Sequence, residues 1–429
     1  MNAQVTQATP SHRRWLVCLM ILFLLHGLFF SSWVSRSPEV QSALGLTTFH
    51  MGIFVTVMGV GSILGTYVGV RVVEWIGARN TVRVTYISIS GAYIYLGYAS
   101  TAGDVLISSV MIFFVGFSAS VGGLSNNLQG AHLEHASPRS ILPRLHGMFS
   151  LGMLVGAGIG ALVISLGISV AVQFLAIGIL VAVCGFWASY GLPLTDSLTH
   201  QKEMSTAELR QVPSKSEWRN VWRERRTLTI AFICVTFVVG ESVAATWLPI
   251  ALVDTGINEA NAALAFMFFA IAMTIGRFVG GYALDRLGRV RTTVIIAVIA
   301  CVGILIVMAN SVVHMAYLGA LLWGLGCSLG FPIAVSALSD DPRMAPPRVN
   351  AMVMTVQTAN LAAGPALGAL GQVVGLLGAF SVPVALFVGT IFSSPATAPL
   401  PRRGAQSETT STDVVDVVQV IAQREIDEF

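Results

Sequence analysis

The chain has 429 residues, of which 55% are hydrophobic and only 10% are charged. Soluble proteins carry about 25% charged residues, so this composition excludes a protein with an ordinary water-facing surface. The formal net charge of +3 does not indicate a nucleic-acid partner, because the basic residues flank apolar segments as membrane anchors do.

Twelve apolar segments are each long enough, at about 20 residues, to cross a bilayer as a helix. They are continuously apolar and about twice as long as barrel strands, so the sequence predicts an all-α membrane protein. The first segment follows two arginines, is longer than a signal-peptide core and lacks a convincing cleavage site, so we expect it to remain as a span. The segments begin near Trp15, Phe49, Val82, Val105, Leu145, Val170, Leu228, Ala260, Thr292, Val312, Val349 and Leu377.

The basic residues predict the orientation of these spans. With the N-terminus in the cytoplasm, only Arg36 among the 24 Lys and Arg residues is expected in an external loop. All the others fall in internal loops, at internal helix ends or in the tails, as the positive-inside rule requires. We therefore expect a multi-pass protein that contacts membrane lipid and has both termini in the cytoplasm.

One long polar interruption divides the twelve spans into two groups of six. The last segment of the chain is also polar, rich in Ser, Thr and acids, and is expected to be disordered. The sequence thus predicts a cytoplasmic N-terminal tail (1–14), an N-terminal six-helix bundle (15–190), a cytoplasmic linker (191–226), a C-terminal six-helix bundle (227–395) and a cytoplasmic tail (396–429).

The two halves repeat one another. The loop between spans eight and nine reads GYALDRLGR (281–289), and the loop between spans two and three reads VRVVEWIGAR (70–79). Aligning Gly77 with Gly288, which are 211 residues apart, also superposes glycines of the preceding spans. A duplicated six-span unit, and hence two pseudo-symmetric bundles, explains this pattern.

Small residues four apart allow helix backbones to approach closely. Their matched positions in the two halves favour helices that slide along a seam, although each pair is also compatible with static packing. The residues are Gly61, Gly65, Gly69, Gly152, Gly156, Gly160, Gly276, Gly280, Gly364 and Gly368.

The GYALDRLGR loop, in a chain of six plus six spans, resembles the signature of the major facilitator superfamily of secondary transporters over about residues 15–395. Three further segments look like a little-characterised bacterial subgroup described as fucose-permease-like: SWVSRSPEVQSALGL (32–46), LHGMFSLGMLVGA (145–157) and ESVAATWLP (241–249). The resemblance implies two six-helix bundles, a central cavity and alternating access. We expect a protein of the bacterial inner membrane that needs no cofactor and works as a monomer, since such a cavity is complete within one chain; the sequence leaves the oligomeric state open.

In that superfamily the loop motif forms a latch in the outward-open state. Carried over to this chain, Asp285 would accept hydrogen bonds from a helix N-terminus and pair with Arg277 or Arg289, with Arg286 beside it. The alternative is that the loop charges only orient the spans.

The first-half copy of the loop departs from this pattern. Glu74 stands where aspartate is usual, Trp75 stands where a basic residue is usual, and only Arg79 keeps the charge at the end of the motif. We therefore expect a weaker latch there. His146, in the subgroup-like segment of span five, is a further candidate for the cytoplasmic gate.

Glu241 lies midway along an otherwise uncharged run from Leu228 to Leu252. A carboxyl at membrane depth is expensive to keep and marks a substrate or proton path. We expect Glu241, helped by His26 in span one, to couple proton movement to solute movement. The alternatives are a permanently neutral glutamic acid bonded to a neighbouring helix and a neutral histidine bonded to a carbonyl group.

Uncharged amides offer both donors and acceptors to hydroxyl-rich solutes. We therefore expect the solute to be held by amides of spans four and eleven and by a tryptophan that stacks on a sugar ring; the alternatives are interhelical hydrogen bonding and packing. These candidates are Asn126, Asn127, Gln129, Gln357, Asn360 and Trp247. Gly123 and Thr246 replace acids that the subgroup often carries.

The sequence contains no GxxxxGK[ST], HExxH or CxxC pattern, which disfavours an ATP-driven pump and an enzyme. The five cysteines are scattered singly, so neither a disulfide nor a metal site is expected. The sequence thus predicts a proton-coupled secondary transporter of a small polar solute such as a sugar. Two alternatives stay open: an exporter of hydrophobic or cationic drugs, and a receptor without turnover.

Overall fold

A computed structural model describes residues 11–135, 141–193, 220–309, 312–341 and 344–400. These parts of the chain are helical and contain no strand. The helices are α1 (His12–Ala43), α2 (Thr48–Thr101), α3 (Val105–His135), α4 (Leu142–Ser165), α5 (Val170–Ser189), α8 (Arg225–Asp254), α9 (Glu259–Ala309), α10 (Val313–Cys327), α11 (Gly330–Leu338), α12 (Ala345–Val374), α13 (Leu376–Ala379) and α14 (Ser381–Ser393), followed by a 3₁₀ turn (Ser394–Thr397).

Two of the helices are long enough to be double spans. α2 has 54 residues and α9 has 51, whereas about 20 residues cross a bilayer. Each is broken by one glycine, Gly77 at φ 75° and ψ 154° and Gly288 at φ 74° and ψ 166°, a backbone conformation that is essentially restricted to glycine. These are the two glycines that the sequence repeat aligns, which supports the duplicated unit.

The helices of the described chain account for twelve spans. Nine helical segments are long and apolar enough to cross a membrane, and α2 and α9 each contribute two spans. α12 adds the remaining span with 30 residues. Residues 1–10, 194–219 and 401–429, which include most of the predicted tails and linker, lie outside the described residues.

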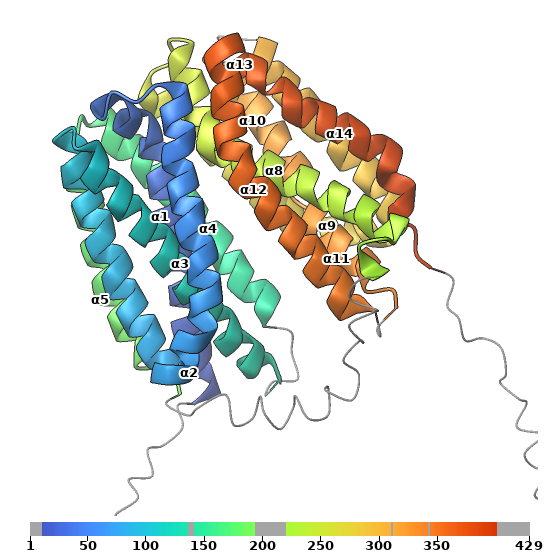
Figure 1. Cartoon of the computed structure of the whole chain (residues 1–429), viewed down its shortest axis with the longest axis horizontal. Coiled ribbons are helices and arrows are strands. Elements are labelled where there is room, and N and C mark those ends of the chain that lie inside the picture. The colour runs from blue at the N-terminus through green and yellow to red at the C-terminus, as the bar shows by residue number, and fades with distance from the viewer. Residues whose placement is uncertain (1–10, 136–140, 194–219, 310–311, 342–343, 401–429) are drawn as a thin grey trace, which may run out of the picture.

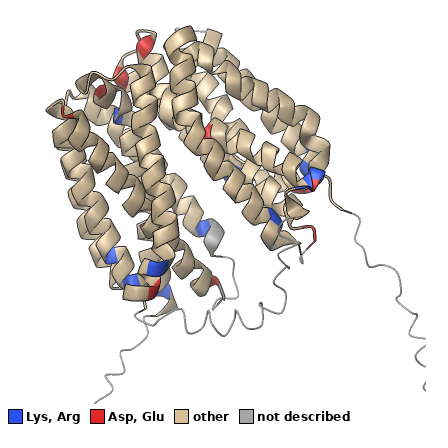
Figure 2. Ribbon diagram, viewed as in Figure 1, with Lys and Arg blue, Asp and Glu red and all other residues tan. Residues whose placement is uncertain are grey.

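Helices α1–α5 form one bundle and α8–α14 form the other (Figure 1). The bundles lie close together at the top of the view and diverge towards the bottom. Most basic residues gather at the lower end (Figure 2), which we call the basic end. Because the spans alternate in direction, this end holds the starts of α1, α4, α8 and α12 and the glycine breaks of α2 and α9. The arginines at or near these points are Arg13, Arg14, Arg71, Arg79, Arg83, Arg144, Arg223, Arg225, Arg226, Arg286, Arg289, Arg291 and Arg348.

Most of the glycine stripes lie inside a bundle. A Cβ atom on Gly61 or Gly65 would overlap the backbone of α3, and one on Gly152 or Gly156 would overlap the backbone of α1. The stripe of α9 likewise faces residues 328 and 329 of its own bundle. Only the stripe of α12, at Gly364 and Gly368, meets the opposite bundle. The other three stripes thus pack helices within a bundle, and the sliding of helices along these stripes stays a prediction.

The prediction that Arg36 lies in an external loop is wrong. α1 continues to Ala43, and Arg36 is buried within it, with 2% of its surface exposed. Its Nε donates to Gln173 Oε1 of α5 at 2.6 Å, and its guanidinium pairs with Glu39. Gln173 in turn donates to Ser32 Oγ at 2.8 Å. A buried guanidinium is tolerated here because its donors have partners.

We expect Arg36→Leu to destabilise the first bundle. Hydrogen bonds to charged groups contribute about 1.5–3 kcal/mol, so the free energy of unfolding should fall by about 2 kcal/mol. Thermal unfolding of the purified protein in detergent measures this change. Arg291→Gln removes an exposed arginine of the other bundle and should leave the melting temperature unchanged; equal effects of the two substitutions would contradict the structural role of Arg36.

Candidate functional site

A cavity of about 630 Å³ lies between the two bundles. Its walls come from α1, α2, α3 and α4 on one side and from α8 and α12 on the other, and its size is typical of small-molecule sites. Aromatic rings of Phe29, Phe30, Phe149 and Trp247 form part of the wall. The polar residues of the wall are His26, Thr56, Ser62, Thr66, Ser120, Asn127, Glu241, Ser242, Thr246, Gln357 and Asn360.

The cavity is closed at the end opposite the basic end by backbone contacts between α2 and α12. A Cβ atom on Gly52 would lie 2.6 Å from the carbonyl oxygen of Gly364, so no larger residue fits there. Gly368 packs against the backbone of Thr48, and the Phe49 amide donates to Gln372 Oε1 at 3.1 Å. The bundles diverge at the basic end (Figure 1). The structure is therefore closed on one side of the cavity.

Glu241 lines the cavity from α8, and its charge has a partner. Arg277 of α9 approaches the carboxylate, with Nη2 3.3 Å from Oε2. The same guanidinium donates from Nη1 to Ser150 Oγ of α4 at 3.3 Å. Arg277 thus connects Glu241 to the opposite bundle, and the prediction that Arg277 pairs with Asp285 is wrong in this conformation.

Sequence reasoning missed this pair because its members are 36 residues apart and lie on different spans. One signal was present: Arg277 is the only charged residue in the apolar run between Glu259 and Asp285. A lone arginine at membrane depth requires a partner, and Glu241 was the only acid of comparable depth in the predicted spans. The expectation that every basic residue except Arg36 lies in a loop, in a tail or at an internal helix end is therefore wrong for Arg277, which lies inside the first span of α9 and pairs with a residue of the cavity wall.

His26 projects into the cavity from α1. Its ring lies 5.1 Å from the ring of Phe29 and 6.0 Å from that of Phe149. A Cβ atom on Gly123 would lie 3.5 Å from the imidazole Cε1, so the lack of a side chain at Gly123 leaves space for this ring. Within the described chain no hydrogen bond holds the imidazole, which is contrary to the alternative of a histidine bonded to a carbonyl group.

The three amides of span four do not act together. Asn127 lines the cavity, with Nδ2 2.9 Å from the Gly123 carbonyl oxygen. Asn126 and Gln129 are buried elsewhere, 2% and 1% exposed, and Asn126 donates to the Tyr86 hydroxyl at 3.0 Å. Their predicted role as solute ligands is therefore contradicted in this conformation. Successive helical residues point about 100° apart, so a cluster along the sequence does not share a face.

The other predicted solute ligands line the cavity. Gln357 and Asn360 face it from α12, and the Asn360 Oδ1 atom has no hydrogen-bond partner in the described chain. Trp247 belongs to the wall as well, but it is only 1% exposed, so the structure presents it mainly as packing.

The predicted latch is not formed in the described chain. Asp285 and Glu74 are both exposed and make no ion pair there. Arg79 instead donates to the carbonyl group of Leu192 from Nε at 2.7 Å, beyond the end of α5. Arg286 stacks on the Tyr282 ring at 4.2 Å.

His146 lies at the start of α4 and makes an edge contact with Phe23, with 5.4 Å between the ring centroids. It is exposed and does not line the cavity.

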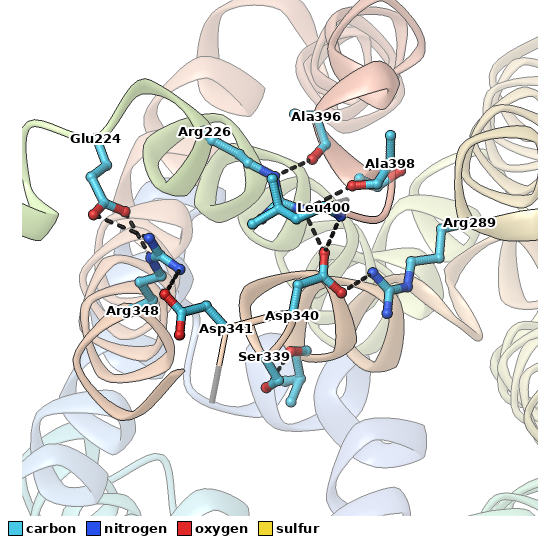
Figure 3. Close-up of polar contacts among 12 residues, drawn as sticks. Glu224, Arg226, Arg289, Ser339, Asp340, Asp341, Arg348, Ala396, Ala398 and Leu400 are labelled. Carbon is cyan, nitrogen blue, oxygen red and sulfur yellow. Dashed lines mark hydrogen bonds and ion pairs between the residues drawn. The ribbon is translucent and has the colours of Figure 1, made fainter. Parts of the chain in front are cut away.

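A different charge network holds the basic end of the second bundle together (Figure 3). Asp340 accepts hydrogen bonds from Arg289 Nη1 at 2.6 Å and Arg226 Nη2 at 2.8 Å, and from the Leu400 amide at 3.2 Å. Sequence reasoning assigned Arg289 to Asp285. Asp340 follows α11, so the pair joins the α9 break to the end of α11.

Burial raises the pKa of Asp340, but the hydrogen bonds from Arg289 and Arg226 outweigh it and hold this pKa below its ordinary value. The carboxylate therefore stabilises the fold fully above about pH 4, and this stabilisation is lost as the pH falls through the lowered pKa. We expect Asp340→Asn to unfold at a lower temperature than the wild type at pH 7, with a smaller difference at pH 3. If the unfolding temperatures of the variant and the wild type differed equally at pH 7 and pH 3, the ionic role of Asp340 would be contradicted.

Residues 122–369, more than half of the chain, match a family model described as Major Facilitator Superfamily. The chain is 26% identical over 383 residues to an uncharacterized MFS-type transporter of Yersinia pestis. This alignment covers 88% of this chain and 94% of the relative. It is 24% identical over 320 residues to an uncharacterized transporter of Sinorhizobium fredii, with 74% of this chain and 81% of the relative covered.

Solved structures share the fold. The nucleoside transporter NupG superposes with a TM-score of 0.71 at 14% identity, over 89% of this chain and 98% of that chain. A D-xylose-proton symporter superposes with a TM-score of 0.68 at 14% identity, over 91% and 98%. No relative among these carries a fucose-permease name, so the narrower subgroup stays a prediction.

Proposed function

Because this chain belongs to the Major Facilitator Superfamily, we propose that it is a secondary transporter that moves a small, neutral, polar solute through the central cavity by alternating access. One observation carries the choice of solute: among the described residues that line the cavity, Glu241 is the only one with a formal charge, and that charge is paired with Arg277. The remaining polar groups of the wall are uncharged amides and hydroxyls and one imidazole.

The pairing of Glu241 argues against the exporter of cationic drugs. A cation would have to displace Arg277 from the carboxylate, at the cost of an unpaired guanidinium. A hydroxyl-rich solute needs donors and acceptors together, which the amides of Asn127, Gln357 and Asn360 supply. The two solved transporters are named for a nucleoside and for D-xylose, both hydroxylated molecules, which accords with this class.

The Glu241–Arg277 pair supports the proposal that transport is coupled to protons. A proton taken up by Glu241 removes the charge that holds Arg277, whose remaining partner in the described chain is Ser150 of the opposite bundle. The protonation state of one carboxyl thus alters a contact between the bundles. His26, which is free of hydrogen bonds in the described chain, is the second candidate in the proton path.

The basic end is assigned to the cytoplasm by the positive-inside rule. With that assignment, the contact between α2 and α12 closes the external side, and the conformation faces inward. Asp285 makes no ion pair with any residue that the structure describes. This supports an inward-facing conformation, because in the superfamily that the loop resembles the latch forms in the outward-open state.

The experiment that tests the proposal combines binding and flux. Purified protein is screened by thermal stabilisation against sugars, nucleosides and lipophilic cations; a ligand at ten times its dissociation constant stabilises by about 1.4 kcal/mol. The stabilising solute is then loaded into protein-containing vesicles. We expect a proton gradient to drive the uptake of a neutral hydroxylated solute into these vesicles. Stabilisation by lipophilic cations alone would replace the proposal with the exporter, and binding without flux would replace it with the receptor.

A further inference from the structure

A second cavity, of about 420 Å³, lies at the basic end of the first bundle, away from the central cavity. It sits between the N-terminus of α1 and the C-terminus of α5 and faces outward. Its wall includes Ser11, Arg13, Arg14, Val17, Trp187 and Gly191. None of these residues lines the central cavity.

Positive charge dominates this cavity. Arg13 and Arg14 are exposed, and neither makes a hydrogen bond through its side chain or an ion pair within the described chain. Arg79 lies close by: burial lowers its pKa, and the positive charges of Arg83 and Arg14 lower it further. No described carboxylate pairs with any of these four arginines. The first turn of α1 adds the positive end of the helix dipole.

An apolar stripe leads from this cavity along the lipid-facing surface. Trp187 is 62% exposed, as is Val183 one turn further into the span, and Ile179 is also exposed on the same side of α5. Val17 of α1, which lines the cavity, is exposed beside it. Exposed Tyr190, on which the Arg83 guanidinium stacks at 4.5 Å, completes an aromatic rim of the kind found at membrane interfaces.

We propose that this second cavity binds the headgroup of an anionic phospholipid, with Arg13 and Arg14 at the phosphate and the acyl chains along Val17 and Val183. Basic pockets between spans at the inner leaflet recognise such headgroups. A cation is excluded by the charge of the wall, and a free phosphate ion would make no use of the apolar stripe. A lipid bound in this cavity would contact both the start of α1 and the end of α5.

The test uses the full-length protein in a neutral detergent, titrated with phosphatidylglycerol or with neutral phosphatidylcholine, and native mass spectrometry to count bound lipid. Arg13→Gln/Arg14→Gln should weaken phosphatidylglycerol binding by about thirtyfold, the factor expected for two arginines at an anionic lipid. Phosphatidylcholine binding should not change. Arg13→Lys/Arg14→Lys keeps the charge and should keep most of the binding.

Arg223→Gln/Arg225→Gln is the matched control. It removes the same charge from two exposed arginines at the basic end of the other bundle, near exposed Trp222, and neither of them lines the second cavity. It should leave phosphatidylglycerol binding unchanged. The proposal is overturned if both double variants lose phosphatidylglycerol binding equally, or if Arg13→Gln/Arg14→Gln loses none. Inorganic phosphate that binds with the same dependence on Arg13 and Arg14 would instead assign the cavity to a free anion. Circular dichroism confirms that each variant is folded.

Discussion

Vesicles that contain Glu241→Gln should no longer accumulate the solute when a proton gradient is imposed. Moving one elementary charge across 100 mV is worth about 2.3 kcal/mol, so a transporter coupled to one proton could concentrate a neutral solute about fiftyfold. The amide cannot take up the proton, and it leaves Arg277 without its carboxylate partner. The ratio of internal to external solute should therefore fall to about one, as measured with radiolabelled solute.

The control replaces another acid by its amide. Asp104 caps the start of α3, where its Oδ1 accepts from the Ile107 amide at 2.9 Å, and asparagine caps a helix equally well. Asp104→Asn should therefore accumulate solute like the wild type. If Glu241→Gln also accumulated it about fiftyfold, a different residue would couple the proton.

Arg277 can be tested together with Glu241. Arg277→Gln leaves a carboxylate without its partner in the membrane, whereas Arg277→Gln/Glu241→Gln leaves no such charge. The double variant should therefore be more stable than the sum of the single effects predicts, with a coupling energy of about 1 kcal/mol in a double-mutant cycle. Additive effects would show that the 3.3 Å pair does not contribute to stability.

Gly52→Val should hold the protein open on the external side. The new Cβ atom would lie 2.6 Å from the Gly364 carbonyl oxygen, so α2 and α12 could not approach as they do in this structure. Overpacking costs about 1–3 kcal/mol, which shifts a two-state equilibrium by roughly 5- to 150-fold. The variant should lose proton-driven accumulation of the solute, while it should still bind solute that is added outside.

Access to the cavity measures this shift. A cysteine introduced at Asn360, in the cavity wall, should react faster with a membrane-impermeant maleimide added outside when Gly52→Val is present. Gly91→Val is the matched control, because Gly91 lies in the same helix and a Cβ atom there meets nothing within 4 Å. Unchanged labelling in Gly52→Val would show that the glycine contact is not the external gate.

The fold was largely predictable because membrane spans are determined locally. In a bilayer each helix must satisfy its own backbone hydrogen bonds, so length and hydropathy alone predict the spans. The breaks at Gly77 and Gly288 were predictable as well. A short loop between two spans needs a backbone conformation that favours glycine, and the sequence repeat puts one such glycine in each half. Arg36 is the exception, because its buried partners Gln173 and Glu39 could not be inferred from span lengths.

The site depended much more on tertiary structure. Sequence alone identified Glu241, His26, Asn127, Gln357 and Asn360 as cavity candidates, because polar groups at membrane depth are costly, and all five line the cavity. It could not distinguish these from Asn126 and Gln129, because helix rotation determines which polar side chain faces the cavity and which binds another helix.

The partner of each charge was likewise decided only by the packed helices. Arg277 meets Glu241 and Ser150, and Arg289 meets Asp340, although Asp285 lies nearer to both arginines in the sequence. Ion pairs form between groups that packing brings within about 4 Å. Sequence by itself therefore determined the twelve spans and the chemistry available at each depth, whereas the packing of the two bundles decided which of those groups meet.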